Sequence, residues 1–350
     1  MLRHLARLAR RVPSMGPRAI AIAVYADVGH TPVAAQQAGF EGVACVDDAA
    51  RALELYCRLY DATRLPWVHH WCAGLLDFLL GMQDDDGRWV NFILEWDGAR
   101  NLEGRTSVAG GLFWQARASL ALARARQSFD DDRIAAALVR GLPHLDGDAV
   151  PPDVRVLHIL TALRLRDCVE HPRPGQLLSG WLDEVASCRI DGVLMNAPEE
   201  RGRPHLWGHL QEGVLAEAGT LIGRDDLVDV ARVSAELVFR DVVESGFAME
   251  RVLPYDVASC VDGLSRMALA IRDPEYDDLA QLARAWFDGR NPAGRPVYDR
   301  DAGRVGDGVD QGRVSAGSGA ESNIVAAQAL FDDTVTLALA LAGSPPIPAG

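Results

Sequence analysis

Residues 45–59 carry the pattern that decides the fold: Cys45-Val46-Asp47-Asp48-Ala49-Ala50-Arg51-Ala52-Leu53-Glu54-Leu55-Tyr56-Cys57-Arg58-Leu59. Apolar residues recur at three- and four-residue spacing between Ala49 and Leu59, which is the period of an α-helix with one buried face. The same spacing runs through most of the chain, and the alternating runs typical of β-strands are short and few. The sequence therefore predicts an all-α fold.

The connections between the predicted helices are of two kinds. We expect helices near 47–61, 67–82, 106–127, 130–141, 153–166, 174–187, 207–222, 225–242, 256–272, 275–288 and 321–342, with a further one near the N-terminus. Short links such as Asp61 to Trp67 alternate with long ones, namely 83–105, 188–206, 243–255 and 289–320. Because short links join antiparallel neighbours, five or six such hairpins in a row predict an (α/α)6 toroid, with inner helices around an axis and outer helices behind them. Loops this long are usually functional, so we expect the cavity mouth where they gather, above the N-termini of the inner helices.

Length and charge narrow the classes of function. The 350 residues suit one large closed domain, predicted over 25–345, with 1–24 as a lead-in helix or tail. All 35 basic residues are arginine, against 49 acidic ones, and the net charge of −14 would repel nucleic acid and anionic membranes. The sequence contains no apolar run of about 20 residues that could span a bilayer. Six cysteines spread singly favour a reducing cytoplasm over a disulfide framework.

Two adjacent carboxylates, Asp47 and Asp48, open the first long helix, and Arg51 follows one turn later. One aspartate suffices to cap the helix and to compensate its dipole. Consecutive helical residues point about 100° apart, so the other aspartate can face the toroid axis, where Arg51 would hold it ionised. We predict Asp47 and Asp48 as catalytic carboxylates and Arg51 as a substrate-binding residue.

The long loop after residue 82 has the composition of a carbohydrate cleft. Asn91 and Trp96 lie in it, among further aromatic and amide side chains. Flat rings stack on the C–H faces of sugars, and planar polar groups bind their hydroxyls. We predict Asn91 and Trp96 as sugar contacts, while Trp89 and Trp114 fit the hydrophobic core equally well.

His205, Trp207 and His209 begin the helix predicted at 207–222. A zinc site would need a third ligand at a recognisable spacing, and the glutamate of a His-Glu-x-x-His motif is absent. We predict that these three residues contact substrate and that the protein uses neither a metal nor another cofactor.

Residues 286–323 contain many Gly, Asp and Asn residues, which predicts a folded loop with left-handed turns. Asn291 and Asp307 lie in this loop, and we predict that both bind substrate. Glu321 starts the last helix, either as a first-turn residue that satisfies backbone donors or as a catalytic carboxylate facing the same opening as Asp47.

The helix predicted at 256–272 adds three candidate substrate contacts, Tyr255, Asp256 and Asp262. The last belongs to Cys260-Val-Asp262-Gly-x-x-Arg266, a weak echo of Cys45-Val-Asp47-Asp-x-x-Arg51. Chance similarity between two short helical segments explains this echo equally well.

At these positions the sequence resembles a known family, the bacterial (α/α)-toroid proteins of the six-hairpin glycosidase type, which occur alone or fused to glycosyltransferases. The matching patches are Asp27-Val-Gly-His30, Cys45-Val-Asp-Asp-Ala-Ala-Arg-Ala-Leu53, Asp86-Gly-x-x-x-Asn91-Phe92, Trp286-Phe-x-Gly-x-Asn291, Val297-Tyr-Asp299 with Asp307-Gly308, and Gly319-Ala-Glu-Ser322. They span nearly the whole chain in the same order. The resemblance implies a carbohydrate-active protein, a glycoside hydrolase acting on an oligosaccharide or polysaccharide, with Asp47, Asp48 and Glu321 at the sugar-facing end.

Two carboxylates can hydrolyse a glycoside when one is protonated and donates to the leaving oxygen while the other is ionised and activates water. We predict Asp48 as general acid or base, Asp47 as its electrostatic or substrate-binding neighbour and Glu321 as the opposing carboxylate. Toroid relatives commonly invert configuration, for which roughly 6.5–9.5 Å separates the two carboxyl groups.

Two other classes of function stay open. Where relatives often carry an acidic Ser-Glu-Asp-Ser segment, this chain has Thr106-Ser-Val-Ala-Gly-Gly111, a departure that favours a non-catalytic sugar-binding or scaffold partner of a glycosyltransferase. A terpene cyclase would account for Val46-Asp-Asp-Ala49 and Gln83-x-x-x-Gly87-x-Trp89. Against a cyclase stand Cys45, where its acid motif needs aspartate, and an aromatic content of 7%, which is thin for a pocket that stabilises carbocations.

Overall fold

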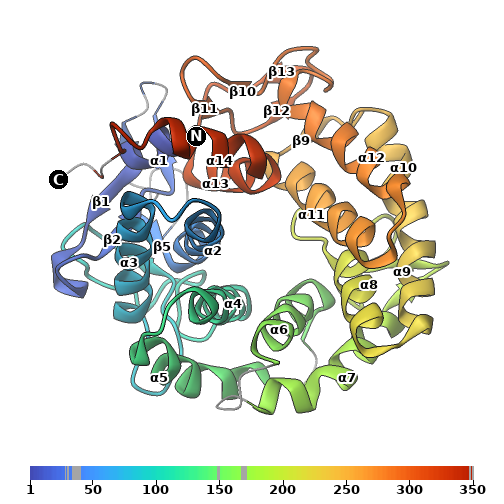
Figure 1. Cartoon of the computed structure of the whole chain (residues 1–350), viewed down its shortest axis with the longest axis horizontal. Coiled ribbons are helices and arrows are strands. Elements are labelled where there is room, and N and C mark those ends of the chain that lie inside the picture. Colours follow the sequence, from blue (N-terminus) through green and yellow to red (C-terminus); the bar gives the residue numbers. More distant parts are fainter. Residues whose placement is uncertain are drawn as a thin grey trace.

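The computed structural model describes residues 1–27, 29, 31–33, 41–147, 150–166, 172–346 and 348. Its helices form a closed ring around a central axis (Figure 1). In these ranges six helices make the inner wall: α2 (Val46–Thr63), α4 (Leu112–Ser128), α6 (Pro152–Leu165), α8 (Gln211–Ile222), α11 (Pro254–Ile271) and α13 (Ala320–Ala329). The outer wall consists of α3 (Pro66–Gly81), α5 (Asp132–Gly141), α7 (Pro172–Ser187), α9 (Asp225–Val238), α12 (Pro274–Arg284) and α14 (Phe331–Ala340).

The ring is closed by contacts between consecutive inner helices. Each inner helix packs against the next, and α13 returns to pack against α2. Each outer helix contacts the inner helix that precedes it in the chain. The predicted (α/α)6 toroid is thus confirmed. Since every outer helix returns antiparallel to its inner partner, all six inner helices start at the same end of the ring.

Local sequence explains how α2 begins and ends. Cys45 caps the helix, because its Sγ accepts a hydrogen bond from the backbone N–H of Asp48 at 3.4 Å. The helix stops at Arg64, whose φ of 54° lies in the left-handed region. Tyr56 on its buried face stacks on Trp71 of α3, with ring centroids 4.8 Å apart. This stacked pair fixes the first hairpin of the ring.

The segment 321–342, which the sequence predicts as one helix, is two helices. The chain breaks at Leu330, where φ is −101° and ψ is 46°, and α14 folds back behind α13. The Oγ1 of Thr334 donates to the carbonyl of Ala327 or of Leu330, both at 2.9 Å, and holds this turn. The break supplies the sixth hairpin, although no glycine or proline marks it in the sequence.

Two inner helices begin later than the sequence predicts. Gly110 has a φ of 83°, so the chain turns before α4 instead of continuing a helix from residue 106. Gly208 has a φ of 71°, and α8 begins at Gln211 rather than at 207. Both glycines leave irregular backbone at the N-terminal end of an inner helix.

The remaining elements are short. The helical ones are α1 (Leu2–Leu8), α10 (Arg240–Glu244), which separates from α9 at Phe239, and the 3₁₀ turns Pro13–Met15, Leu142–Leu145 and Ala285–Asp288. The strands are β1 (Ala9–Arg11), β2 (Ile20–Ile22), β3 (Tyr25–Ala26), β4 (Pro32–Val33), β5 (Ala44–Cys45), β6 (Phe92–Ile93), β7 (Arg189–Ile190), β8 (Val193–Leu194), β9 (Arg251–Val252), β10 (Tyr298–Asp299), β11 (Arg304–Val305), β12 (Val309–Asp310) and β13 (Arg313–Val314).

Two of these sheets pair loops that lie next to inner-helix N-termini. β5 pairs antiparallel with β6, with Cys45 opposite Phe92, so the loop that carries Asn91 reaches the start of α2. β12 pairs with both β13 and β9, with Val309 opposite Val252. The loop before α13 is thereby joined to the loop before α11. The long loops thus hold neighbouring inner helices in register.

The N-terminal segment, predicted as a lead-in helix or tail over 1–24, packs onto the ring. Helix α1 is largely buried and contacts α13 and α14. β1 pairs antiparallel with β2, with Ala9 opposite Ile22. The amino group of Met1 donates to the carbonyl of Gly303. The segment therefore contributes to the core of the toroid.

Five cysteines lie in the described ranges, and each is a free thiol: Cys45, Cys57, Cys72, Cys188 and Cys260. The sixth, Cys168, lies outside the described residues, as do Val28 and His30 of the first family patch. None of the helices that the structure describes combines the length and the apolarity needed to cross a membrane.

Gly213 on α8 lets the backbones of α8 and α11 approach each other closely. A Cβ atom at this position would lie 2.7 Å from the carbonyl oxygen of Gly263 and 2.8 Å from its Cα, so backbone would have to move. We expect Gly213→Ala to lower the free energy of unfolding by about 1–3 kcal/mol. Urea denaturation monitored by circular dichroism measures this change.

The matched control is Gly180→Ala on the outer helix α7, where a Cβ atom meets nothing within 4 Å. That substitution should raise the free energy of unfolding by roughly 0.5–1 kcal/mol, because alanine lowers the entropy of the unfolded chain. Equal effects of the two substitutions would contradict the packing of α8 on α11.

Candidate active site

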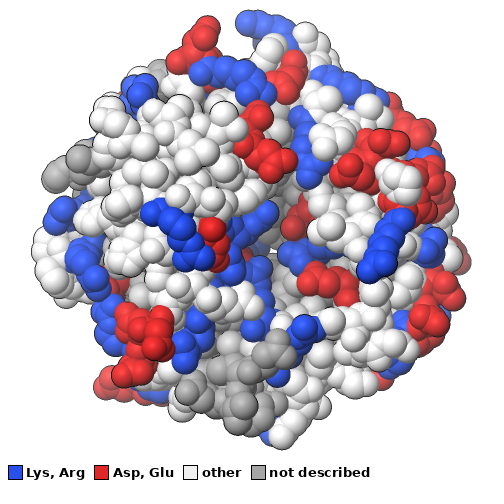
Figure 2. Space-filling model, in the orientation of Figure 1, with Lys and Arg blue, Asp and Glu red and all other residues white. Residues whose placement is uncertain are grey.

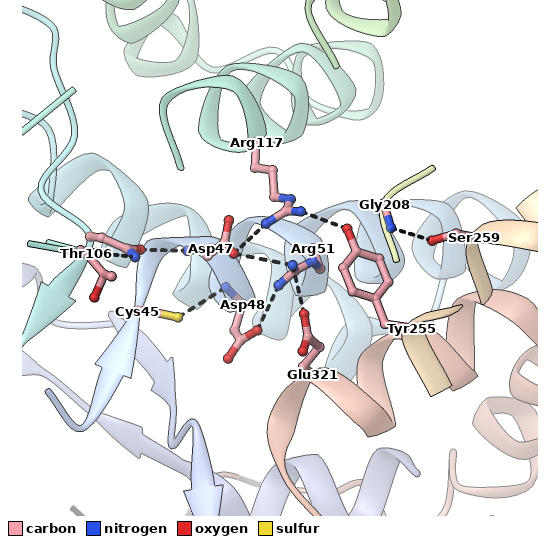
Figure 3. Close-up of polar contacts among 11 residues, drawn as sticks. Cys45, Asp47, Asp48, Arg51, Thr106, Arg117, Gly208, Tyr255, Ser259 and Glu321 are labelled. Carbon is pink, nitrogen blue, oxygen red and sulfur yellow. Dashed lines mark hydrogen bonds and ion pairs between the residues drawn. The ribbon is translucent and has the colours of Figure 1, made fainter. Parts of the chain in front are cut away.

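Polar side chains from four inner helices converge at the N-terminal end of the ring. They are Asp47, Asp48 and Arg51 of α2, Arg117 of α4, Tyr255 of α11 and Glu321 of α13. Figure 3 shows the three carboxylates pointing toward Arg51, with Arg117 and Tyr255 beside it. The structure therefore brings together the three acids that the sequence predicts as catalytic.

Arg51 is the centre of this cluster. Its Nη1 donates to Asp48 Oδ1 at 3.0 Å, while its Nη2 lies 2.9 Å from Glu321 Oε1 and 3.3 Å from Asp47 Oδ2. The first and third contacts are the spacings i,i+3 and i,i+4 along one helix. The contact to Glu321 links α2 to α13 across the junction that closes the ring. Arg51 is only 7% exposed, so water screens these contacts little.

Arg117 adds a second buried guanidinium. Its Nη1 donates to Asp47 Oδ2, and its Nη2 donates to the hydroxyl of Tyr255 at 2.7 Å (Figure 3). The ring of Tyr255 lies under the guanidinium of Arg51, 4.9 Å from ring centroid to Cζ. Tyr255 thus joins both arginines from the opposite side of the site.

The adjacent aspartates have opposite electrostatic surroundings. Burial raises the pKa of Asp48 to about 7; Arg51 opposes this shift, whereas the charges of Glu321 and Asp47 add to it. Burial would also raise the pKa of Asp47, but Arg117 and Arg51 outweigh it and lower that pKa. Below about pH 7 Asp48 therefore holds a proton that it can donate, while Asp47 is ionised.

Charge counting explains why one proton stays in the cluster. Three carboxylates share two guanidiniums, which leaves one excess negative charge in a buried site. A single proton removes that excess. Asp48 is the carboxylate that takes it, because its side chain is 5% exposed against 22% for Asp47 and 43% for Glu321.

An aromatic rim lies on the far side of Tyr255. Trp207 is 37% exposed and stacks on His205, with centroids 4.0 Å apart and an angle of 8° between the rings. Its ring lies 6.1 Å from that of Phe113 and 6.4 Å from that of Tyr255. His205 Nε2 is 4.0 Å from Asp153 Oδ2. These residues extend the site with flat surfaces and a second acid–base pair.

Asp153 is the second carboxyl group with a raised pKa. Burial raises its pKa to about 6, although the N–H of Val154 and the charge of Arg117 oppose the shift. Its Oδ1 is buried and has no hydrogen-bond partner in the described part of the chain. Burial lowers the pKa of His205, so this imidazole is neutral at pH 7.

Asn91 and Asp307, predicted as sugar ligands, position catalytic candidates. The Oδ1 of Asn91 accepts from the backbone N–H of Asp47 at 3.2 Å. Asp307 Oδ1 accepts from the N–H of Gly319 and the hydroxyl of Ser322, both at 2.7 Å. Asp307 thereby anchors the start of α13, from which Glu321 projects.

His209 and Asn291 have a different role from the predicted one. His209 is fully buried; its Nδ1 pairs with Asn196 at 2.7 Å and its Nε2 with Glu212 at 2.9 Å. Asn291 donates to two carbonyls of its own loop and accepts from the N–H of Ala293. Both side chains use their hydrogen bonds inside the protein, so they shape loops rather than face a ligand.

Three other predicted contacts make no hydrogen bond or ion pair with the cluster around Arg51 in the described ranges. Trp96 is partly buried against the hydrophobic core. Asp256 is 8% exposed and accepts from the N–H of Leu253, and burial raises its pKa to about 6. Asp262 lies two turns into α11 and pairs with Arg266 at 2.7 Å. The segment Cys260–Arg266, which resembles the start of α2 in sequence, therefore lies further from the N-terminus of its helix than Cys45–Arg51 does.

The lining of the central cavity matches the predicted site only in part. A cavity of about 620 Å³ is lined by Arg51, Arg117 and Tyr255 at one end and continues along the later turns of the inner helices. Asp47, Asp48 and Glu321 are absent from its lining. The three lining residues therefore form a layer with the carboxylates on one side and the cavity on the other.

The sequence interpretation missed Arg117, Asp153 and Tyr25. The guanidinium of Arg117 lies 5.1 Å from the ring centroid of Phe113, four residues earlier, but such a helical contact does not mark Arg117 as a site residue. Burial raises the pKa of the Tyr25 hydroxyl to about 12, with contributions from Asp307, Glu321 and Asp48. Tyr25 therefore stays protonated beside the site, and no local pattern reveals its place.

In the ranges that the structure describes, no group of three or more His, Cys, Asp or Glu side chains is arranged to hold a metal ion. Asp48 and Glu321 are already paired with Arg51. Asp47 is paired with both Arg51 and Arg117. These ion pairs disfavour a cation among the three carboxylates.

Comparison with known proteins finds solved structures with the same fold. No family model and no curated protein matches the sequence. A sugar epimerase from a ruminal bacterium matches with a TM-score of 0.70 at 12% identity, over 95% of each chain. The α-mannanase of glycoside hydrolase family 76 from Bacteroides thetaiotaomicron matches with a TM-score of 0.56 at 10% identity, over 86% of this chain and 88% of the other. An endoglucanase from Clostridium thermocellum, solved with cellotetraose, gives 0.53 at 14% identity over 87% of this chain and 62% of the other. The chain has the (α/α)6-toroid fold of these proteins.

Asp153→Asn should stabilise the protein at neutral pH. The pKa of Asp153 is raised in the folded state, so ionisation costs stability as pH rises from about 4 through about 6. We expect the variant to exceed the parent by roughly 1–2 kcal/mol in unfolding free energy at pH 7.5, with a smaller difference at pH 4.5. Urea denaturation at both pH values measures it.

Asp183→Asn is the matched control, because its side chain on α7 is 58% exposed. It should change the unfolding free energy by less than about 0.5 kcal/mol at either pH. A gain for Asp153→Asn that is the same at pH 4.5 and 7.5 would rule out ionisation as its cause.

Proposed function

We propose that the protein is a carbohydrate-active enzyme, and specifically a glycoside hydrolase that cleaves an oligosaccharide or polysaccharide. One observation carries the proposal: Asp48 is a buried acid with a pKa of about 7, and it shares Arg51 with a second, partly exposed carboxylate, Glu321. An acid beside a carboxylate is the equipment for glycosidic bond cleavage.

The residues take separate roles. Protonated Asp48 donates its proton to the glycosidic oxygen as the bond from that oxygen to the anomeric carbon breaks. Glu321 removes a proton from the water that forms the new bond to that carbon. Ionised Asp47, held by Arg117 and Arg51, stabilises the positive charge that develops on the sugar ring.

The rim of the site supports a sugar as the substrate. Trp207 offers an exposed ring, and Phe113 and Tyr255 lie beside it. Aromatic faces stack on the C–H surfaces of sugars, and the neighbouring carboxylates accept hydrogen bonds from hydroxyls. The charged cluster is unlike the apolar, ring-lined pocket that a terpene cyclase needs.

A second candidate is epimerisation or isomerisation of a reducing sugar. Two observations favour it. The alignment with the sugar epimerase covers 95% of each chain, and its TM-score of 0.70 exceeds the 0.56 of the mannanase and the 0.53 of the endoglucanase. In addition, Asp153 lies beside His205 at the rim of the site. A neutral imidazole can remove a proton next to a carbonyl, and a carboxyl group with a raised pKa can return one.

Deuterium incorporation separates these two reactions. Epimerisation or isomerisation through proton transfer carries deuterium from D₂O into a carbon position of the sugar, and hydrolysis leaves carbon-bound hydrogens unchanged. Incubation with glucose, mannose, cellobiose and mannobiose in D₂O, followed by mass spectrometry, reads both outcomes. We expect cleaved disaccharide without carbon-bound deuterium.

Substitution of the carboxylates tests the hydrolase assignment. We expect Asp48→Asn and Glu321→Gln each to lower kcat by roughly 10²–10⁴, since each removes a proton-transfer group, with Asp47→Asn also losing activity. Asp85→Asn in an exposed loop is the control and should retain parental activity. A reducing-end assay on a panel of oligosaccharides gives the rates, and full activity in all three site variants would sink the assignment.

Binding without turnover would instead favour the non-catalytic alternative. Isothermal titration with the same oligosaccharides would then show saturable binding while no product forms on long incubation. In that case the protein acts as a sugar-binding or scaffold partner of a glycosyltransferase.

The pH profile of hydrolysis reports the acid. Because the reaction needs protonated Asp48, the rate should fall as pH rises through about 7. Measuring kcat from pH 4 to pH 9 at constant ionic strength gives the pH at which the rate falls. A rate that stays constant between pH 6 and pH 9 is incompatible with Asp48 as the acid.

A further inference from the structure

The exposed ring of Trp207 belongs to a short rim loop, residues 205–210, that precedes α8. Figure 2 shows acidic and basic side chains around the hollow at the centre of the ring. Ion pairs engage such charges, as between Arg164 and Glu54 at 2.9 Å in the cavity lining. A flat apolar surface for a sugar therefore comes from an aromatic ring. Trp207 offers one, because at 37% exposure it is the most exposed of the eight tryptophans.

Helix α11 holds two successive amides of the rim loop. The backbone N–H of Gly208 donates to Ser259 Oγ at 2.9 Å (Figure 3). Burial raises the pKa of Asp256, one turn before Ser259, and a hydrogen bond from the backbone of Trp207 opposes this rise. Both side chains of α11 are buried, so water competes little for these bonds. The rim loop is therefore fastened to the first two turns of α11.

Gly208 also lets the rim loop lie against Tyr255. Its φ of 71° is in the left-handed region, and a Cβ atom there would lie 3.2 Å from the hydroxyl oxygen of Tyr255. That hydroxyl accepts from Arg117 Nη2 at 2.7 Å, and Arg117 pairs with Asp47. Direct contacts thus set the position of the rim loop relative to the catalytic candidates.

Asn196 fixes the other side of the rim loop. Its side chain is buried, and its Nδ2 donates to the carbonyl of His205 at 2.9 Å. Its Oδ1 accepts from His209 at 2.7 Å and from Gln211 at 2.8 Å. The backbone N–H of Asp153 donates to the carbonyl of Asn196 at 3.4 Å. Asn196 therefore joins the start of α6, the rim loop and the start of α8.

His205 passes this anchoring on to Trp207. Its Nδ1 donates to the carbonyl of Trp207 at 3.0 Å, because a carbonyl oxygen can only accept. The imidazole stacks on the indole, with centroids 4.0 Å apart. On other sides the indole lies beside the rings of Phe113 and Tyr255. The orientation of the Trp207 ring is therefore fixed within the protein.

We infer that Ser259 and Asn196 are positioning residues that hold Trp207 as a fixed platform for the sugar unit next to the one at the carboxylates. The inference rests on the proposed function and narrows its substrate class to oligosaccharides of at least two units. The Trp207 ring lies 6.4 Å beyond that of Tyr255, which in turn lies 4.9 Å from Cζ of Arg51. A ring held in place loses less freedom on binding than a mobile one, so the anchors contribute to affinity.

Acrylamide quenching of tryptophan fluorescence tests the positioning without any substrate. Ser259→Ala removes one anchor, so quenching should become stronger than in the parent. The same substitution in a Trp207→Phe protein should leave quenching unchanged, which assigns the effect to this ring. Ser128→Ala, which removes a serine hydrogen bond to Asp61 at the other end of an inner helix, is the matched control and should quench as the parent does.

Asn196→Asp is the second variant. It keeps an acceptor for His209 and Gln211 but loses the donor to the carbonyl of His205, so quenching should again become stronger. Melting curves confirm that each variant is folded. Parental quenching in either variant overturns the positioning role of that residue, and parental quenching in both overturns the inference.

Kinetics on cellotetraose and mannotetraose test the substrate class. We expect Ser259→Ala to raise KM by roughly threefold to tenfold with kcat unchanged, since one hydrogen bond is lost while the carboxylates keep their contacts. A lower kcat at unchanged KM overturns the inference, because Ser259 would then act on the reacting groups. If the parent cleaves neither tetraose, the proposed function fails for these sugars, and the quenching result alone decides the positioning.

Discussion

The structure depends on the buried guanidinium of Arg51. It contacts Asp47 and Asp48 on its own helix and Glu321 on the helix that closes the ring. Gln328 of α13 also donates to the carbonyl of Arg51 at 3.1 Å, so backbone and side chain of one residue join the first and last inner helices. Removing a guanidinium of this kind leaves buried carboxylates uncompensated, which is far more costly than losing a surface ion pair.

The same layer divides the axis of the ring into two electrostatic regions. On one side lie the three carboxylates, whose excess charge keeps a proton on Asp48. On the other side lies a cavity in which arginines and acids are paired with one another, as in Arg164 with Glu54 and Arg266 with Asp262. Arg51, Arg117 and Tyr255 belong to both regions, because their polar ends contact the carboxylates while they line the cavity. A toroid can hold two polar regions in this way, since inner helices present different turns at different depths.

Much of the fold was predictable because its signals are local. Helical spacing identified the hairpins, and alternation of short and long connections indicated their arrangement. The break at Leu330 was not predictable, since the residues around it favour a continuous helix and only packing of α14 behind α13 turns the chain. Of the site, Asp47, Asp48 and Arg51 were accessible through i,i+3 and i,i+4 spacing. Arg117 and Asp153 were not recognised, because each lies on another helix and gains its importance from neighbours that are remote in sequence.

The sequence alone determined the helical class, the chain order of the hairpins and the Asp-Asp-x-x-Arg arrangement on α2, because each follows from spacings within a few turns. Only the tertiary structure decided that Glu321 meets Arg51, that His209 is enclosed and that Asp48 rather than Asp47 retains a proton. The physical reason is burial: pKa values and hydrogen-bond partners depend on which atoms exclude water, and ring closure brings those atoms from helices at opposite ends of the chain.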